Sequence, residues 1–290
     1  MKAEERRFVD EVVRRVQESD HTPADTARRR FIDEVLSLVA RPSHATRPAT
    51  VGSSTPGLDL TSEWDGIVTR VEAAIGERFE HLNDSQQALV RAFEESQGLL
   101  SPLGDARYEP HHTQLIAWAL RRQGGFGRAL RHSFLELIGE EFPLDGWDVR
   151  AEAWMTDGSR PDVVVAIPSR WRCIIEVKFD AQERDAQLDD YKAHLNAACD
   201  NDDSQGTLVF LTPEGRRGKT TNEDHTPLAF RDLAKAWLPA VLGAGAEAAY
   251  LRLWLVELAH EVYGIGELGC PRGHWSLTSR ARFLTFLNEV

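Results

Sequence analysis

The order of apolar runs along the chain predicts an α/β fold, in which helices cover a mixed β-sheet. Three short runs, within residues 147–154, 163–167 and 172–178, are separated by only a few residues, which is typical of an antiparallel meander. A helical segment at 182–198 then precedes a fourth apolar run at 207–211. A helical crossover joins strands that run parallel, so the predicted sheet combines both strand directions.

Helices are predicted both before and after this group of strands in the sequence. Upstream, apolar residues at helical spacing predict a packing helix within about 62–97. Two further helices, at 115–120 and 129–139, are separated by a glycine-rich break. Downstream, the pattern predicts helices at roughly 226–242 and 246–262, so the strands are expected to be enclosed by helices.

Residues 1–60 are expected to form a helical arm that ends in a flexible linker. The segment RRFVDEV at 6–12 returns as RRFIDEV at 29–35, each within a short amphipathic pattern. The repeat is either a coincidence between two arginine-rich helices or an arm that docks a protein partner or a second copy. Residues 41–60 are rich in Pro, Ser, Thr and Gly, as flexible linkers are. Residues 61–290 are assigned to the α/β domain with its C-terminal helices.

Composition restricts the classes of protein to consider. The net charge of −12, from 34 basic and 46 acidic residues, is unfavourable for a protein that coats nucleic acid, although it allows a local basic cleft. Three scattered cysteines favour a reducing compartment. With no signal-peptide pattern and no apolar run near the ~20 residues that span a bilayer, a cytoplasmic protein is expected.

Charged residues stand at the ends of two of the predicted core strands. Asp162 opens the strand at 163–167, and Glu176 and Lys178 close the next one. Antiparallel pairing brings Asp162 and Glu176 to the same edge of the sheet, where two carboxylates repel each other unless a cation lies between them. Lys178 shares the face of Glu176, because side chains alternate along a strand. The pattern therefore predicts either a simple salt bridge or a site for a divalent metal such as Mg²⁺.

Four short motifs resemble those of the PD-(D/E)XK nuclease superfamily. They are PD at 161–162, EVK at 176–178, EPHHTQLIAWAL at 109–120 and LVFLTPEG at 208–215. The third is similar to the E-x-x-x-[ST]-x-x-[LI]-A-W-x-L helix of one uncharacterised subgroup, and the fourth to the strand and turn of that subgroup. In addition, Gln187 and Tyr191 resemble the Q-x-x-x-Y signature of RecB-like members, and their spacing puts both on one helical face. The resemblance covers about 105–240.

The resemblance implies a restriction-endonuclease-like core, with element order α-β-β-β-α-β, and a metal-dependent phosphodiesterase. It implies that Asp162 and Glu176 bind Mg²⁺ or Mn²⁺ with help from the Val177 carbonyl, and that Lys178 is catalytic. It also implies that Glu109 is an auxiliary acid and metal ligand. Pro110, directly after Glu109, suits a first helical turn but leaves the direction of the Glu109 side chain open.

Residues around this core are expected to support the site or to hold the substrate. By the same resemblance, Gln187 and Tyr191 support the site or touch the phosphate backbone. Basic residues are the other candidates, and each group is either solvated surface or a phosphate-collecting flank of the cleft. They lie in the loop after the fourth strand and around the glycine-rich break: Arg216, Arg217, Lys219, Arg121, Arg122, Arg128 and Arg131. At most one of His111 and His112 can join the site, and the tryptophans are assigned to the core.

These observations lead to the prediction of a Mg²⁺- or Mn²⁺-dependent nuclease that hydrolyses DNA, with host defence and DNA processing as candidate roles. Two alternatives remain open. One is a nuclease fold without activity that serves as an interaction module, which the intact Asp162, Glu176 and Lys178 set disfavours. The other is an RNase, because nothing in the sequence distinguishes a contact to the ribose 2′-hydroxyl from its absence.

Overall fold

The computed structural model describes residues 60–155, 158–181, 184, 186–202, 204–218, 224–265 and 268–289. These residues form two compact units, 60–87 with 272–289, and 88–271. The predicted arm, apart from its last residue, lies outside the described residues, so the arm and the single domain assigned to 61–290 stay predictions.

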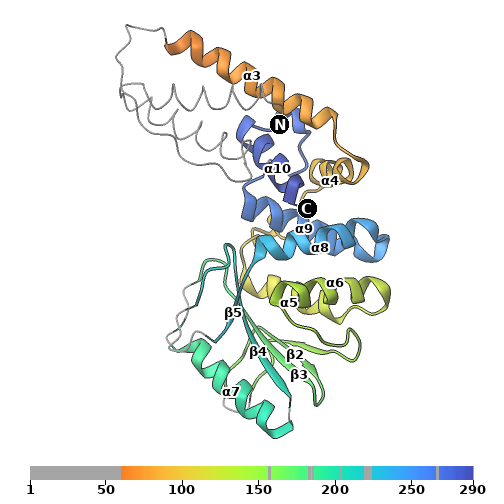
Figure 1. Cartoon of the computed structure of the whole chain (residues 1–290), viewed down its shortest axis with the longest axis vertical. Coiled ribbons are helices and arrows are strands. Elements are labelled where there is room, and N and C mark those ends of the chain that lie inside the picture. The colour runs from red at the N-terminus through yellow and green to blue at the C-terminus, as the bar shows by residue number, and fades with distance from the viewer. Residues whose placement is uncertain are drawn as a thin grey trace. The chain divides into compact units, whose positions relative to one another are not determined.

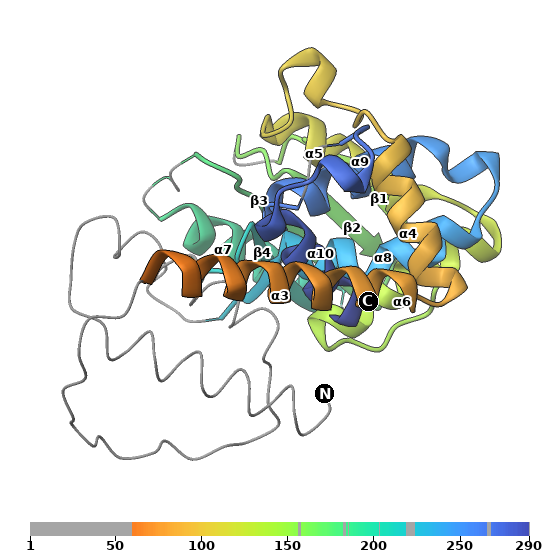
Figure 2. The same ribbon diagram turned by 90° about the horizontal axis from the view of Figure 1, so that it is seen from above.

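The smaller unit is helical. Helices α3 (Leu60–Glu80) and α10 (Leu277–Glu289) lie side by side (Figures 1 and 2), and the rings of Phe79 and Phe283 stack with their centroids 6.1 Å apart. A short 3₁₀ turn, η3 (Arg272–His274), precedes α10.

The single helix expected within 62–97 is divided into α3 and α4 (Asp84–Glu95). The division lies at Asn83, whose side-chain oxygen accepts the Gln86 N–H (2.9 Å) while Gln86 Oε1 accepts the Asn83 N–H (3.2 Å). This reciprocal pair is a capping box, which begins a new helix. The apolar spacing continued through the break, and therefore did not reveal it.

The larger unit contains a five-stranded sheet with its strands in chain order. The strands are β1 (Asp148–Ala151), β2 (Val163–Ile167), β3 (Trp171–Val177), β4 (Gln205–Thr212) and β5 (Thr226–Ala229). Strands β1 to β3 are antiparallel, and β3, β4 and β5 are parallel, which confirms the predicted meander and crossover. β5 differs from the expectation of a helix from about residue 226, because its four residues pair only with β4.

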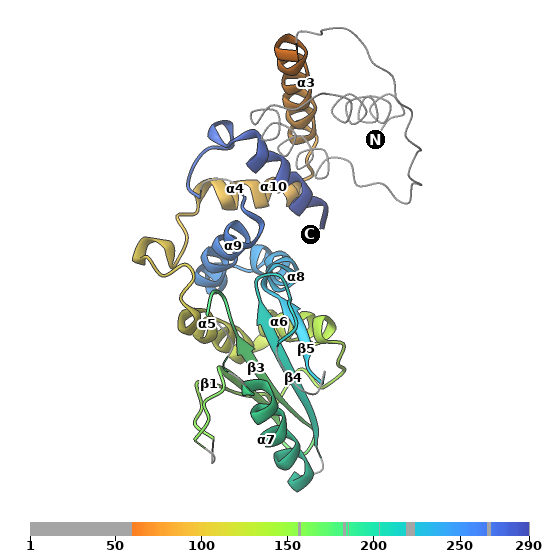
Figure 3. The ribbon, with the colours of Figure 1, turned by 90° about the vertical axis from the view of Figure 1, so that its left-hand side faces the viewer.

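Helices cover both faces of the sheet. They are α5 (Glu109–Arg121), α6 (Gly124–Ile138), α7 (Gln187–Asp202), α8 (Phe230–Gly243) and α9 (Ala249–Tyr263), with 3₁₀ turns η1 (Ser101–Leu103) and η2 (Ala246–Ala248). α7 lies on one face and α5 and α6 on the other (Figure 3), while α8 packs on α6 and α9 on α8. The order α-β-β-β-α-β confirms the restriction-endonuclease-like core. None of the described helices is long and apolar enough to cross a membrane.

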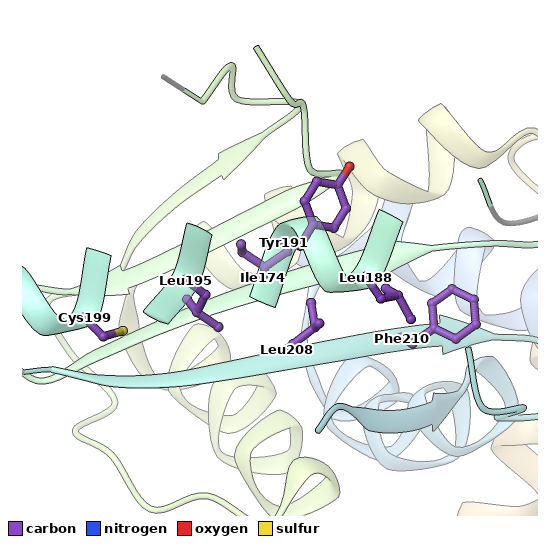
Figure 4. Close-up of a cluster of buried hydrophobic side chains, with 7 residues drawn as sticks. All are labelled: Ile174, Leu188, Tyr191, Leu195, Cys199, Leu208 and Phe210. Atoms are coloured by element: carbon purple, nitrogen blue, oxygen red, sulfur yellow. The ribbon is translucent and has the colours of Figure 1, made fainter. Parts of the chain in front are cut away.

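Strand β3 is buried on both faces. Because both faces are covered, every residue of β3 except Arg172 is buried. Figure 4 shows the layer on the α7 side, formed by Ile174, Leu188, Tyr191, Leu195, Cys199, Leu208 and Phe210. Tyr191 lies at its border, with the hydroxyl directed away from the apolar side chains. This packing holds the first turn of α7 above the carboxyl end of β3.

Candidate active site

Three charged residues converge at the carboxyl end of β3. The pairing of Val163 with Ile175 places Asp162 across from Glu176 on the adjacent strand. Opposite residues of an antiparallel pair point to the same face, and so does Lys178, two residues beyond Glu176. Asp162 Oδ2 accepts the Val177 N–H at 2.7 Å, which fixes this carboxylate against β3.

Glu176 is the most deeply buried member of this cluster, with 1% of its surface exposed. Its Oε1 accepts hydrogen bonds from Lys178 Nζ (2.7 Å) and Gln187 Nε2 (2.6 Å). Its Oε2 is buried and accepts no hydrogen bond. A buried carboxylate oxygen without a donor is costly, so Oε2 marks a position where a cation is favoured, or a proton that lets Glu176 hydrogen-bond to Asp162.

The ionisation of the cluster reflects burial and an excess of negative charge. Burial, followed by the charge of Asp162, raises the pKa of Glu176 to about 8. Burial also raises the pKa of Asp162, although the Val177 N–H and Lys178 oppose it. Burial by itself would lower the pKa of Lys178, but the neighbouring carboxylates, Glu176 first, outweigh it and the pKa is raised. One ammonium therefore does not balance the two carboxylates.

The first turn of α7 orients Glu176 from above. Gln187 begins the helix, and its amide nitrogen donates to Glu176 and also lies 3.2 Å from the Tyr191 hydroxyl. That hydroxyl in turn contacts the Arg160 carbonyl at 3.3 Å. Burial and then the Glu176 charge raise the Tyr191 pKa to about 12, so the phenol stays a neutral hydrogen-bonding group. Gln187 and Tyr191 thus form a chain from Glu176 to the segment that precedes β2.

Glu109 reaches the same region from the other side of the sheet. It is the first residue of α5, and Pro110 fits within the first turn. Its Oε1 accepts the N–H groups of Phe179 (2.7 Å) and Ala181 (3.1 Å), and its Oε2 lies 3.6 Å from Lys178 Nζ. The structure therefore joins Glu109 to the cluster through the turn after β3 and through Lys178.

The loop after β4 begins beside Lys178, whose N–H is bonded to the Leu211 carbonyl at 2.9 Å. Arg216 is held by a bond from its N–H to Thr212 Oγ1 (2.9 Å), and its guanidinium lies 5.1 Å from the centre of the Phe210 ring. Phe210, on β4, is the register partner of Glu176, so the loop residue Arg216 places its guanidinium over the strand that neighbours the cluster. Arg217 follows in the same loop, and Lys219 lies outside the described residues.

The arginines around the glycine-rich break are placed differently. Arg131 is buried and donates to the carbonyls of Leu120, Arg122 and Leu144, so it closes the end of α5 and does not collect phosphate. α5 has 13 residues, so this end lies roughly 20 Å from Glu109. Arg131 therefore fits neither alternative given for this group, because it is not solvated surface and does not line the cleft.

Of the two adjacent histidines, His112 belongs to the core. Its Nδ1 accepts the Trp254 indole N–H at 3.0 Å and its Nε2 lies 2.8 Å from the Ala106 carbonyl. Burial lowers its pKa, which favours the neutral ring that this pair of bonds requires. Trp154, in contrast, is 73% exposed, so its assignment to the core is wrong. The sequence holds no signal for this, because Trp154 follows an apolar strand pattern.

A divalent metal fits the donor set at this edge, although the described residues contain no group of three His, Cys, Asp or Glu side chains that could hold a metal ion. The carboxylates of Asp162 and Glu176 are the oxygen donors that Mg²⁺ and Mn²⁺ prefer, and these ions commonly keep several waters. The Glu176 oxygen without a donor is the observation that supports the fit.

Comparison with known proteins agrees with the geometry. Residues 99–238 match the model of the PD-(D/E)XK nuclease superfamily, which confirms the resemblance predicted from the sequence for this segment. The matched segment includes Glu109, Asp162, Glu176, Lys178 and Gln187. Searches of the curated proteins and of the solved structures found no match. The RecB-like assignment from Gln187 and Tyr191 stays a prediction.

Proposed function

We propose that the protein is a nuclease that uses Mg²⁺ or Mn²⁺ to hydrolyse phosphodiester bonds in DNA. The observation that carries the proposal is the buried Glu176 oxygen without a donor, beside the carboxylate of Asp162. Two adjacent buried carboxylates destabilise the fold unless a cation or a proton is present, so this pair has no purely structural benefit.

The residues divide the work between ion binding and orientation. Asp162 and Glu176 would hold the ion, with the Val177 carbonyl as a third donor. When bound, the ion supplies Lewis acidity, which activates a water molecule and neutralises charge on the phosphate. Gln187 holds Glu176 in the orientation needed for binding, and the bond from the Val177 N–H does the same for Asp162.

Lys178 is proposed as the catalytic residue that acts on the reacting groups. Its ammonium lies between Glu176 (2.7 Å) and Glu109 (3.6 Å), so ion pairs with both carboxylates hold it at the cluster. A raised pKa keeps it protonated at neutral pH. From this position it orients the attacking water or stabilises the charge that develops on the phosphate. Glu109 in this scheme sets the position of Lys178 and adds to the negative field around the ion.

DNA is proposed as the substrate, and Arg216 and Arg217 as backbone contacts. Arg216 lies over the register partner of Glu176, where a phosphate near the reacting bond would pass. Local arginines at this edge reconcile DNA binding with the net charge of −12. Lys219 is the third basic residue of this loop.

The test is cleavage of labelled linear, circular and single-stranded DNA, and of RNA, with Mg²⁺, Mn²⁺ or EDTA. We expect cleavage of DNA that EDTA abolishes and that Lys178→Ala abolishes. Lys192→Ala is the matched control, because Lys192 is similarly shielded and ion-paired, with Asp224 at 2.8 Å, but lies outside the cluster. Equal rates for the two variants would contradict the role of Lys178.

A readout that is independent of cleavage separates an inactive fold from an active one. Mn²⁺ binding, followed by electron paramagnetic resonance, should persist in Lys178→Ala and be lost in Asp162→Ala. Mn²⁺ binding without cleavage of any substrate would contradict the nuclease and favour an interaction module.

A further inference from the structure

Trp154 is exposed on a segment that leads directly into the site. It lies on the connection between β1 and β2, and 73% of its surface is accessible. An exposed Trp leaves a large apolar surface in water, so such residues are enriched where a ligand or partner covers them. The superfamily match and the cluster described above give this ring no role.

The ring is fixed by a chain of contacts. The Arg160 guanidinium lies 5.5 Å from its centre, and Arg160 Nη2 lies 3.3 Å from Glu152 Oε1. Glu152 is held in turn by Gln114 of α5 at 3.3 Å. Glu152 also has a left-handed backbone, with φ of 49°, which is unusual for a residue other than glycine. Trp154 is therefore linked through Arg160 and Glu152 to α5.

A pocket of about 170 Å³ lies beneath Trp154, between the edge of the sheet and α7. It exists because α7 covers β3 and β4 but leaves the α7-facing residues of β2, Val164 and Ala166, half-buried. Its walls are largely apolar, with Ile174 and Leu195, and Arg150 and Arg172 lie at the β1–β3 side. Pockets for drug-sized ligands are about 300–1,000 Å³, so this one suits a single planar ring.

The connection that carries Trp154 begins and ends at the edge of the sheet where Asp162 lies. The Glu152 N–H is bonded to the Asp162 carbonyl at 2.7 Å, so the connection that carries Trp154 starts and ends beside Asp162. Trp154 is two residues beyond Glu152, which is about 7 Å of extended chain. The Arg160 carbonyl also contacts the Tyr191 hydroxyl, which links the support of Trp154 to the chain that orients Glu176.

We propose that Trp154 and this pocket bind an unpaired nucleobase of the substrate strand, within a few nucleotides of the bond that is cut. The inference rests on the proposed nuclease function and deepens it, since it makes single-stranded DNA, or the frayed end of a duplex, the preferred substrate. Every base has a flat face that stacks on an aromatic ring, so no base preference is required. The neighbouring Arg150, Arg160 and Arg172 match the charge of the adjoining phosphates, although Asp148 pairs with Arg150.

A base that is stacked within a duplex cannot reach such a pocket. Proteins that read single strands splay bases out onto aromatic side chains, and the cost of unstacking is avoided when the base is already unpaired. The inference therefore predicts weaker binding to a blunt duplex than to a single strand of the same sequence.

The test measures the affinity of the Lys178→Ala protein for a short fluorescein-labelled DNA strand, with a single abasic site moved along it. The strand with its abasic site at one particular position should bind more weakly than the other strands, because it has lost the base that stacks on Trp154. Adding Trp154→Leu to the Lys178→Ala protein should lower its affinity for the intact strand by about 5- to 100-fold and abolish this position dependence. Adding Trp154→Phe instead keeps an aromatic face, so most of the affinity and of the position dependence should be retained.

Tyr250→Leu is the matched control, because Tyr250 is also an exposed aromatic residue (66%) but lies on α9, which contributes no residue to the cluster. It should leave both readouts unchanged. An RNA strand with the same position dependence supports the base site and moves the proposed substrate from DNA to RNA.

Three results would overturn the inference. If the Lys178→Ala protein binds the strand and Trp154→Leu changes neither affinity nor position dependence, only the base site fails. If Trp154→Leu alters self-association and not DNA affinity, the residue belongs to a protein interface. If no nucleic acid binds at all, the base site fails together with the proposed function.

Discussion

Two buried glutamates, Glu176 and Glu257, show how differently one residue type is used in this molecule. Each is 1% exposed, so burial does not distinguish them. Glu257, on α9, accepts the N–H groups of Leu99 (2.8 Å) and Leu100 (2.7 Å) and both the N–H and the hydroxyl of Ser101. Glu176 accepts two donors on one oxygen and none on the other.

The comparison teaches that the partners of a buried carboxylate, and not its burial, indicate its role. Donors from the backbone satisfy both oxygens of Glu257, so it anchors the segment before α5. Gly98 makes room for this anchor. Its φ is 76°, and an added Cβ would lie 2.9 Å from Glu257 Oε1. Glu176 is buried facing a second carboxylate, and burial first and the Asp162 charge second raise its pKa to about 8. A site that binds a cation reversibly requires such an incompletely satisfied group.

The largest expected effect is on catalysis. Glu176→Gln should lower the rate of DNA cleavage by roughly 10³-fold or more, because it removes a charged ligand of the proposed ion while keeping the shape of the side chain. Initial rates at saturating Mg²⁺ measure this, with the melting temperature as a control for folding. A rate within about tenfold of the parent would show that Glu176 is as structural as Glu257.

The second effect is on stability. Glu257→Gln should lower the free energy of unfolding by about 2–4 kcal/mol, because an amide offers one acceptor oxygen and turns its NH₂ toward backbone donors. Urea denaturation measures it, and Glu176→Gln is the comparison, with no loss of stability expected in the metal-free protein. Equal destabilisation by both variants would break the distinction between anchor and site.

A third effect concerns pH, and a comparison of the wild type with Glu176→Gln isolates the part due to Glu176, because Asp162 and His112 also have shifted pKa values. Its pKa is about 8 in the folded protein and 4.5 in an unperturbed side chain, so the folded state binds more protons between these values. The free energy of unfolding contributed by this group therefore falls as pH rises from about 4.5 to about 8. Urea denaturation with EDTA across this range should show that the unfolding free energy of the wild type falls relative to that of Glu176→Gln, and the same relative fall is expected for Glu257→Gln. A constant difference between the wild type and Glu176→Gln would contradict the assignment.

The smallest effect is expected at Glu109. Glu109→Gln keeps an oxygen for the Phe179 and Ala181 N–H groups but removes a charge 3.6 Å from Lys178 Nζ. The maximal rate should fall by about tenfold, which corresponds to about 1.4 kcal/mol, and half-maximal cleavage should need more Mg²⁺. A Mg²⁺ titration that overlays the parent curve would make Glu109 purely structural, like Glu257.

Much of the sheet could be predicted from the sequence, because its signals are local. The apolar runs of β2, β3 and β4 are bounded by turn residues, and the helix before β4 implies a parallel crossover. β5 and the division between α3 and α4 were not predictable in this way. β5 exists through its pairing with β4, and the capping box at Asn83 lies within an uninterrupted apolar spacing.

By itself the sequence determined that Asp162, Glu176 and Lys178 share one face of the sheet and that Gln187 and Tyr191 share one face of a helix. Both follow from the periods of strands and helices, which depend only on neighbouring residues. The motif resemblance placed Glu109 at the site, but only the tertiary structure decided which way its side chain points, that Glu257 is an anchor, and that Trp154 stands exposed over a pocket. The physical reason is that these roles depend on partners distant in the chain, which only the packed fold brings within bonding distance.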